Sequence, residues 1–443
     1  MQRWLVVKRE GVAMRLTHNS LSVLFSITLL SVGTTLSGCG GSDGSSPEGP
    51  PVNELSSNKA RVTAPAVSSE DALTFANDNL ALSVDLHLAL RSSESGNFVF
   101  SQTSISTALG MLYAGARTTT AAQMADTLHF SLPAARLHAG FNALDLALTT
   151  PSTSNASAFQ LTFANSIWIQ KDFSVLPGFL DTLAENYGAG LFVEDFQSAP
   201  EPARNTINGW VAHRTEGQIP SLFPQGSINT LTRLVLANAV YFHGDWKVKF
   251  KKDSPNEIFH ALSGDVSVPT MHGANNAAIW SGAGWNAGVL DYVGNTTSMI
   301  IVVPDAGTFA AFESGLTFES LSAILAGAGS GGRADLIMPR FKFSTDVGLN
   351  ETLSALGMPE AFSDGADFSG INGGRDLRIQ SVIHQAIINV DESGTTASAA
   401  TGVSVGVTSL PPTLVVNRPF LFFVRHNPTG AILFQGRVVD PSK

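Results

Sequence analysis

Polar and apolar positions alternate along an uncharged stretch near the end of the chain. Between Glu392 and Arg418 there is no charged residue and no side chain bulkier than leucine. Read with a period of two, one face is small or β-branched and carries Thr395, Ala397, Ala399, Thr401, Val403 and Val405. The other face is small and mostly polar, and it carries Thr396, Ser398, Ala400, Gly402, Ser404 and Gly406. This alternation is typical of a half-buried strand, and Pro411 and Pro412 end it because proline cannot donate to a central ladder. The pattern predicts an exposed loop that can become a strand.

Other segments show the periods of helices and strands. Residues 69–91 and 118–130 have the helical period, and the first follows a Ser-Ser-Glu-Asp start. Residues 159–170 alternate, while 234–246 and 335–343 are predicted as further strands, the former buried. The chain is 44% hydrophobic and 14% charged, so it can bury a sizeable core. Composition alone allows the last 375 or so residues to form one large domain or two.

The N-terminus has the pattern of an export signal. Basic residues precede an apolar run over residues 21–36 that contains Ser and Thr, shorter than the roughly 20 apolar residues of a membrane span. We predict a signal peptide over residues 1–38, with an uncleaved membrane helix as the alternative and Met14 as an alternative start. Leu36-Ser37-Gly38-Cys39 resembles a bacterial lipobox, in which the cysteine is acylated. Cys39 is the only cysteine, so no intrachain disulfide forms, and residues 39–67 are predicted as a flexible Gly/Ser/Pro-rich tether.

Charge and motif spacing argue against several classes of protein. A net charge of -10 disfavours nucleic acid as a partner. No His pair has metal-ligand spacing, so we expect no metal and no cofactor. Residues 402–406 fit G-x-S-x-G, but no helix start follows, and His426 precedes Asp440, the wrong order for that hydrolase class. Residues 327–332 fit G-x-G-x-x-G but precede a strand, so we interpret them as a turn. We therefore predict that the protein is not an enzyme.

Two motifs at the C-terminal end carry a family resemblance. Residues 391–400, D-E-S-G-T-T-A-S-A-A, resemble the hinge of the reactive-centre loop in inhibitory serpins. Residues 417–422, N-R-P-F-L-F, resemble the family's C-terminal signature, and residues 430–441 close the chain as serpins do. The resemblance implies an α+β serpin fold, with a single domain at 68–443 of three β-sheets and eight or nine helices. It also implies an exposed loop, with hinge and reactive centre within 389–416.

The resemblance also assigns site residues. The hinge residues are Glu392, Gly394, Thr395, Thr396, Ala397, Ser398, Ala399 and Ala400. The shutter and breach residues, which in the family control opening of the central sheet, are Ser101, Ser104, Asn238, His384, Trp246 and Arg340. Arg340 falls where serpins often place a lysine that pairs with the hinge glutamate. His384 as a core histidine without a switching role, and Trp246 as a core residue first, remain open alternatives.

The same resemblance implies a suicide mechanism. A target serine protease cuts the loop and forms a covalent acyl-enzyme, and the cut loop then inserts as a central strand. Counting from Gly394 and counting back from Asn417 both place the cut between Thr408 and Ser409, with cleavage after Val407 as the alternative. A small β-branched residue there favours elastase-like or subtilisin-like proteases. Small uncharged hinge residues allow insertion without burying a charge.

Departures from the family pattern leave other functions open. Gln102 replaces a usual proline, and Thr396 stands where inhibitory members often have glutamate. The alternatives are a non-inhibitory serpin acting as a cleavable decoy, or a binding or adhesion scaffold. Only Arg117 lies near the helix that binds heparin in some serpins, so we expect no heparin-type activation, and we expect a monomer. The predicted location is the cell envelope or the exterior, anchored to membrane by lipid on Cys39. Gly40 favours the outer membrane if the cell has two membranes.

Overall fold

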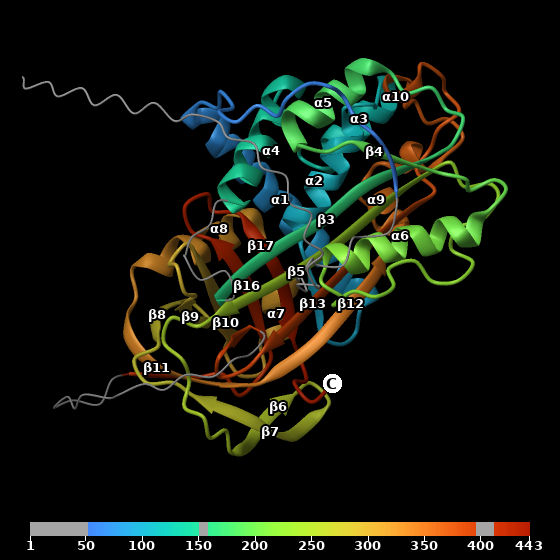
Figure 1. Ribbon diagram of the computed structural model, residues 1–443. Helices are drawn as coiled ribbons and strands as arrows, with labels where there is room; N and C mark the ends of the chain where they lie inside the picture. The colour runs from blue at the N-terminus through green and yellow to red at the C-terminus, as the bar shows by residue number, and fades with distance from the viewer. Residues whose placement is uncertain (1–51, 150–157, 396–411) are drawn as a thin grey trace, which may run out of the picture. The chain divides into compact units, whose positions relative to one another are not determined.

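Two β-sheets and ten α-helices make up the part of the chain that the structure describes, residues 52–149, 158–395 and 412–443 of a computed structural model (Figure 1). The helices are α1 (Ser69–Ser93), α2 (Gln102–Tyr113), α3 (Thr118–Thr127), α4 (Ala134–Thr149), α5 (Pro177–Tyr187), α6 (Pro200–Arg214), α7 (Phe309–Ser314), α8 (Phe318–Ala326), α9 (Asn350–Leu356) and α10 (Ser369–Asn372). None of these helices is long and apolar enough to cross a bilayer.

The first sheet has seven strands and carries the site. In spatial order they are β1 (Asn53–Leu55), β4 (Leu191–Glu194), β3 (Phe159–Gln170), β5 (Leu234–Asp245), β14 (Gly394–Thr395), β13 (Ser381–Val390) and β12 (Phe341–Gly348). Alternation along β5 sends Leu234 and Leu236 into the core that α2 shares, while Val235 and Ala237 pack in the cluster that includes α6. Figure 1 shows α6 lying across this sheet. Both faces are covered, which explains why residues 234–237 of this strand are all apolar.

The second sheet has ten strands within the described ranges. They are β2 (Phe98–Phe100), β17 (Ile432–Val438), β16 (Phe420–His426), β10 (Thr297–Pro304), β9 (Trp285–Asp291), β8 (Ala277–Gly282), β11 (Gly332–Pro339), β7 (Gly264–His272) and β6 (Asn256–Ala261), with β15 (Thr413–Val415) beside β11. The sequence predicted three sheets. In the structure two of these sheets are joined into one, because β11 pairs with β8 at residues 332–334 and with β7 at residues 337–339.

The strand predicted over residues 335–343 is divided in the structure. Strand β11 ends at Pro339 and β12 begins at Phe341, so Arg340 stands between the two sheets. Proline has no N–H to continue a ladder, and the next N–H, from Arg340, donates to Pro269 O at 2.9 Å. The break places the Arg340 side chain at the junction of the sheets.

The start of α2 accommodates the unusual Gln102. Ser101 caps the helix by accepting from the Ser104 N–H at 3.2 Å. Gln102 is buried, and its amide donates to Asn79 Oδ1 at 2.6 Å. Where a proline would supply fixed backbone geometry, this chain ties the first helical residue to α1 through a side-chain hydrogen bond.

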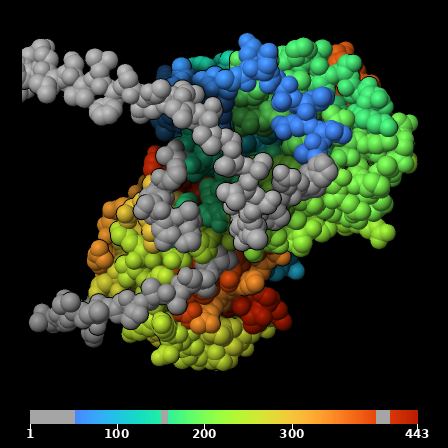
Figure 2. All heavy atoms as spheres, viewed as in Figure 1, coloured from blue at the N-terminus to red at the C-terminus, as the bar shows by residue number. Residues whose placement is uncertain are grey.

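The segment predicted as a flexible tether is held in place over residues 52–67. Strand β1 pairs with β4, and Gly190 is needed beneath it because a Cβ there would lie 2.5 Å from Leu55 O. Arg61 donates to Asn142 Oδ1 at 2.9 Å and to Asp145 Oδ2 at 2.6 Å, and Val62 N–H donates to a carbonyl of α5. In Figure 2 the blue residues at the start of the described chain lie against the green surface. Residues 52–67 therefore pack on the domain, which the sequence had placed at 68–443.

Candidate functional site

A two-residue strand separates β5 from β13 at one end of the seven-stranded sheet. Strand β14 lies between β5 and β13 and pairs antiparallel with both: Gly394 opposite Asp245, and Thr395 opposite Gly244 and Val390. Farther along, β5 and β13 pair directly and in parallel, over residues 235–240 and 381–386. Gly394 and Thr395, two residues of the predicted hinge, thus already lie between β5 and β13, and the two strands pair directly over residues 235–240 and 381–386.

A tight turn joins β13 to β14. Asp391 Oδ1 accepts from Ser393 N–H at 2.8 Å and Gly394 N–H at 3.3 Å, and Asp391 N–H donates to Gly394 O at 3.0 Å. Trp246 holds the turn from outside, donating its N–H to Ser393 O at 2.8 Å and its indole Nε1–H to Asp391 O at 2.9 Å. A carboxylate that accepts from following backbone amides is a common turn-forming device. A fixed turn therefore leads the chain from β13 into β14.

Gly394 and Thr395 fit their places closely. A Cβ on Gly394 would lie 2.1 Å from Gly244 O, so only glycine fits without a shift of the backbone. Thr395 is 1% exposed, and its hydroxyl is 2.8 Å from the Tyr292 hydroxyl. Burial raises the pKa of Tyr292, so the phenol stays protonated. The Tyr292 ring stacks on Trp246 at 4.5 Å between centroids, which joins the hinge to the buried breach tryptophan.

The hinge glutamate pairs with the arginine between the sheets. Arg340 donates through Nε to Glu392 Oε1 at 2.7 Å and through Nη2 to the same oxygen. The Ser254 hydroxyl donates to this carboxylate as well, and Phe250 N–H donates to Glu392 O at 3.0 Å. The Glu392 side chain is only 13% exposed. This arrangement fixes the first hinge residue while the next ones enter the sheet.

The predicted shutter residues meet in one buried polar network under the closed part of the sheet. Asn238 donates to Ser104 Oγ at 2.8 Å and to Asn165 Oδ1 at 2.6 Å, and it accepts from His384 Nδ1–H. Ser101 N–H donates to His384 Nε2 at 3.0 Å, and Ser104 Oγ donates to Asn165 Oδ1 at 2.8 Å. Asn238 lies opposite Asn165 on one side and His384 on the other. Hydrogen bonds therefore join β3, β5, β13 and the start of α2 across the pairing of β5 with β13.

Asn165 is the member of this network that sequence reasoning did not single out. It lies in an alternating strand and is only half-buried, so its own surroundings in the sequence resemble those of any exposed strand residue. The signal that identifies it is the pairing register of β3 with β5, which places it directly opposite Asn238.

His384 is neutral in this network. Its Nε2 accepts a backbone N–H and therefore carries no proton, which makes Nδ1 the protonated nitrogen. Burial lowers the pKa of His384 to about 3. Protonation would remove the acceptor for Ser101 and place an uncompensated charge among buried groups.

We expect the fold to be acid-labile for this reason. An unfolded histidine takes up its proton near pH 6.5, whereas folded His384 takes it up only near pH 3. Stability is therefore lost as pH falls through this window, by about 1.4 kcal/mol per pH unit. Burial also lowers the pKa of His138, to about 4, which steepens the slope. Urea unfolding between pH 7.5 and 4.5 measures how the free energy of unfolding depends on pH. The His384→Gln substitution should reduce this dependence by about one proton. An unchanged slope in this variant would contradict the assignment.

Several predicted residues lie outside the described ranges. They are Cys39, Thr396, Ala397, Ser398, Ala399, Ala400, Thr408 and Ser409. Among the residues that the structure does describe, no group of three or more His, Cys, Asp or Glu side chains is arranged to hold a metal ion.

Comparison with known proteins gives one family. Residues 76–441 match the serpin (serine protease inhibitor) family. The leukocyte elastase inhibitor of Bos taurus is 37% identical over 380 residues, 82% of this chain and 98% of the relative. A serpin-like protein of Thermococcus kodakarensis is 35% identical over 383 residues, 85% and 86% of the two chains.

Solved structures agree with this assignment. Native tengpin, a thermophilic serpin, superposes with a TM-score of 0.76 at 27% identity, over 88% of this chain and 100% of that chain. Uncleaved ovalbumin gives 0.74 at 26% identity, over 83% and 100%. The chain belongs to the serpin family, a family of protease inhibitors and not of enzymes. The α+β serpin fold predicted from the sequence is confirmed, with ten helices in the described part where eight or nine were expected.

Proposed function

We propose that this protein inhibits serine proteases as a suicide substrate, by inserting its cleaved loop between β5 and β13. The observation that carries the proposal is strand β14, because its two residues already occupy this position at one end of the sheet. Insertion needs the six direct pairs between β5 and β13 to separate. The hinge is small and uncharged beyond Glu392, so each further residue enters without a buried charge.

The proposed cut lies between Thr408 and Ser409, and the proposed targets are elastase-like or subtilisin-like. The leukocyte elastase inhibitors among the relatives, at 36–37% identity, support this class of target. The loop itself supports it too, since Val405, Val407 and Thr408 offer small side chains and no Arg or Lys lies nearby. Cleavage after Val407 would give the same preference.

A protease assay tests the proposal. A form lacking residues 1–48, which keeps the compact unit from Gly49 to Lys443, is incubated with an elastase-type protease and run on a denaturing gel. We expect an SDS-resistant complex and, by mass spectrometry, a released peptide that begins at Ser409.

The matched variant is Thr408→Arg. Because the residue before the cut enters the primary pocket of the protease, this change should abolish the elastase complex and create one with trypsin. A complex with elastase that survives the substitution would place the cut elsewhere.

The second candidate function is a cleavable decoy or binding scaffold. Thr396, in place of the usual glutamate, and the flexible Gly402 and Gly406 favour it because they can slow insertion. A protein of this kind is cut by the same proteases without forming a complex, so the same gel distinguishes the two functions. Clean cleavage alone would favour the decoy.

The proposed location is the cell envelope, with the mature chain anchored by lipid on Cys39. The lipobox-like Leu36-Ser37-Gly38-Cys39 supports it. In cells fed labelled palmitate, the full chain should incorporate label and Cys39→Ser should not. Equal labelling of the two would exclude lipid attachment at this residue.

A further inference from the structure

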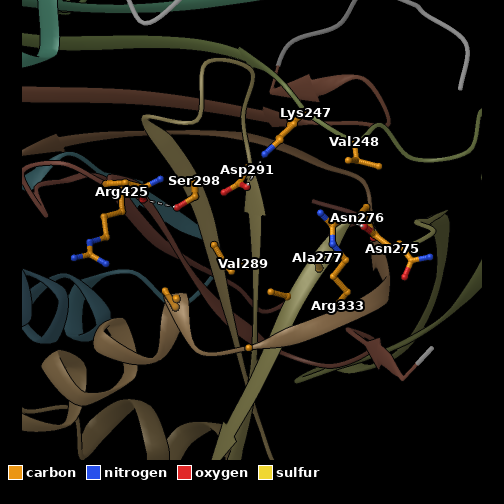
Figure 3. A pocket seen from close by; sticks show the side chains of 15 residues that line it. Lys247, Val248, Asn275, Asn276, Ala277, Val289, Asp291, Ser298, Arg333 and Arg425 are labelled. Carbon is orange, nitrogen blue, oxygen red and sulfur yellow. Dashed lines mark hydrogen bonds and ion pairs between the residues drawn. The ribbon is translucent and has the colours of Figure 1, made fainter. Parts of the chain in front are cut away.

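A cavity of about 540 Å³ lies on the ten-stranded sheet (Figure 3). Its walls come from β8, β9, β10, β11 and β16, from residues 328–331 after α8, and from Lys247 and Val248 just after β5. This volume falls in the range of cavities that bind small organic molecules. None of the shutter residues contributes to it.

The cavity is positively charged in an acidic protein. Lys247, Arg333 and Arg425 line it against a single carboxylate, Asp291, whereas the whole chain carries a net charge of -10. In Figure 3, Arg425 lies on one side of the hollow and Arg333 on the other. Apolar residues form part of the same lining: Val248, Ala277, Ala278, Val289 and Ala328. Such a lining suits an anion with a hydrocarbon body, because the cations can bind the acid group and the apolar residues can contact the body.

Two buried donors in the wall have no acceptor among the described residues. Asn276 is 7% exposed; its Oδ1 accepts from Leu336 N–H at 3.1 Å, but its Nδ2 has no partner. Arg425 Nε is also buried and unpaired, although its Nη1 donates to Leu325 O at 3.3 Å. Buried donors in proteins are almost always satisfied. These two therefore point to a ligand with acceptor atoms.

The ammonium of Lys247 is available to such a ligand. It lies 3.5 Å from Asp291 Oδ2, longer than a strong charged hydrogen bond, and the two side chains are 48% and 45% exposed. In Figure 3 the Lys247 side chain points toward Asp291, and Asn276 also belongs to the cavity wall.

We propose that this cavity binds a small organic anion, a molecule with a carboxylate, sulfonate or phosphate group on an apolar body. The acid group faces Lys247 and the Nδ2 of Asn276, and the body lies over Val289 and Ala277.

The cavity is linked to the hinge through two adjacent residues. Lys247 N–H donates to Asp291 O at 2.9 Å, and the neighbours of this pair, Trp246 and Tyr292, form a β-bridge and stack. Tyr292 in turn contacts the Thr395 hydroxyl. A ligand that draws Lys247 away from Asp291 therefore acts on the same backbone pair that holds the inserted hinge. The binding site does not depend on the proposed inhibitory function, whereas an effect of the ligand on inhibition does.

The test uses a fluorescent aromatic sulfonate, 1-anilinonaphthalene-8-sulfonate, and the neutral N-phenyl-1-naphthylamine, which has the same body without the acid group. We expect saturable 1:1 binding of the sulfonate, weakened about tenfold by Lys247→Met and at least as much by Asn276→Asp. Lys252→Met, at an exposed lysine outside the cavity, should leave the affinity unchanged. The neutral probe should show no dependence on Lys247. Thermal unfolding shows whether each variant is folded. Because Lys247 is half-exposed, Lys247→Met should fold even if the Asn276 variant does not, and the test then rests on Lys247 alone.

Two outcomes would overturn the site: no saturable binding of the sulfonate, or equal affinity in the Lys247→Met protein. In the second case the probe occupies another cavity, such as the apolar one of about 350 Å³ between α1 and α4. Hydrogen exchange of residues 391–395 tests the link. The saturating sulfonate should change their exchange rates at least threefold in the wild type and not in Lys247→Met. If the sulfonate binds but the exchange rates do not change, the link to the hinge is refuted and the binding site still stands. A failed protease assay would contradict neither the binding site nor the link.

Discussion

Thr395→Arg is expected to convert the proposed inhibitor into a substrate. Thr395 is buried between β5 and β13 with its hydroxyl against Tyr292, and an arginine there would place a charge inside the sheet. The cost of burying an unpaired charge exceeds what a two-residue strand can offset. The hinge should therefore leave the sheet, and the cut loop should fail to insert. In the elastase assay the complex disappears while the released C-terminal peptide remains.

Ser393→Arg is the matched control for this experiment. Ser393 lies in the turn outside the sheet, and only its backbone takes part in the hydrogen bonds of that turn. The same charge two residues earlier should leave complex formation intact. Thr395→Ser, which keeps the hydroxyl, should also retain the complex. A Thr395→Arg protein that still traps protease would rule out insertion through this part of the sheet.

Asn238→Ala is expected to have the largest effect on stability, about 3–5 kcal/mol. The substitution removes a fully buried amide that donates to Ser104 and Asn165 and accepts from His384. The buried His384 Nδ1–H then loses its acceptor, and the side chains of Ser104 and Asn165 keep only the hydrogen bonds between these two residues. Loss of these bonds also weakens the closed part of the sheet, so we expect faster unfolding and a tendency to insert the uncut loop. The urea midpoint and the unfolding rate measure the effect.

Asn165→Ala provides the comparison within the same network. Asn165 is half-buried, so water can replace part of what is lost, and we expect about 1–2 kcal/mol. Equal effects of the two substitutions would show that the network does not depend on Asn238 as its centre.

Regular elements with a clear period could be predicted from the sequence. Strand β3 has the predicted bounds, Phe159–Gln170, because alternation against a half-exposed face leaves a strong signal. Family resemblance indicated His384 and Asn238, which the structure places side by side. It also indicated Arg340 opposite Glu392, and the two side chains form an ion pair.

Features that depend on distant partners could not be predicted in this way. Residues 53–55 have no period of their own, and they form a strand only because β4, about 140 residues later, offers a free edge. Residues 394–395 have the alternation of a strand, but whether they stay in a loop or enter the sheet depends on the gap between β5 and β13. The division at Arg340 likewise requires two sheets that the sequence does not place.

If the cleaved loop inserts as proposed, strand β14 also sets the position of every later hinge residue in the sheet. Thr401, six residues after Thr395, would lie beside Asn238, six before Gly244, and beside His384, six before Val390. The three registers agree, because Asn238 and His384 already face each other. A threonine hydroxyl can both donate and accept, so it would replace the bond between the amide and the imidazole that its arrival breaks. If the loop inserts as proposed, Thr401 is a polar residue at the position where it could replace the contact between Asn238 and His384.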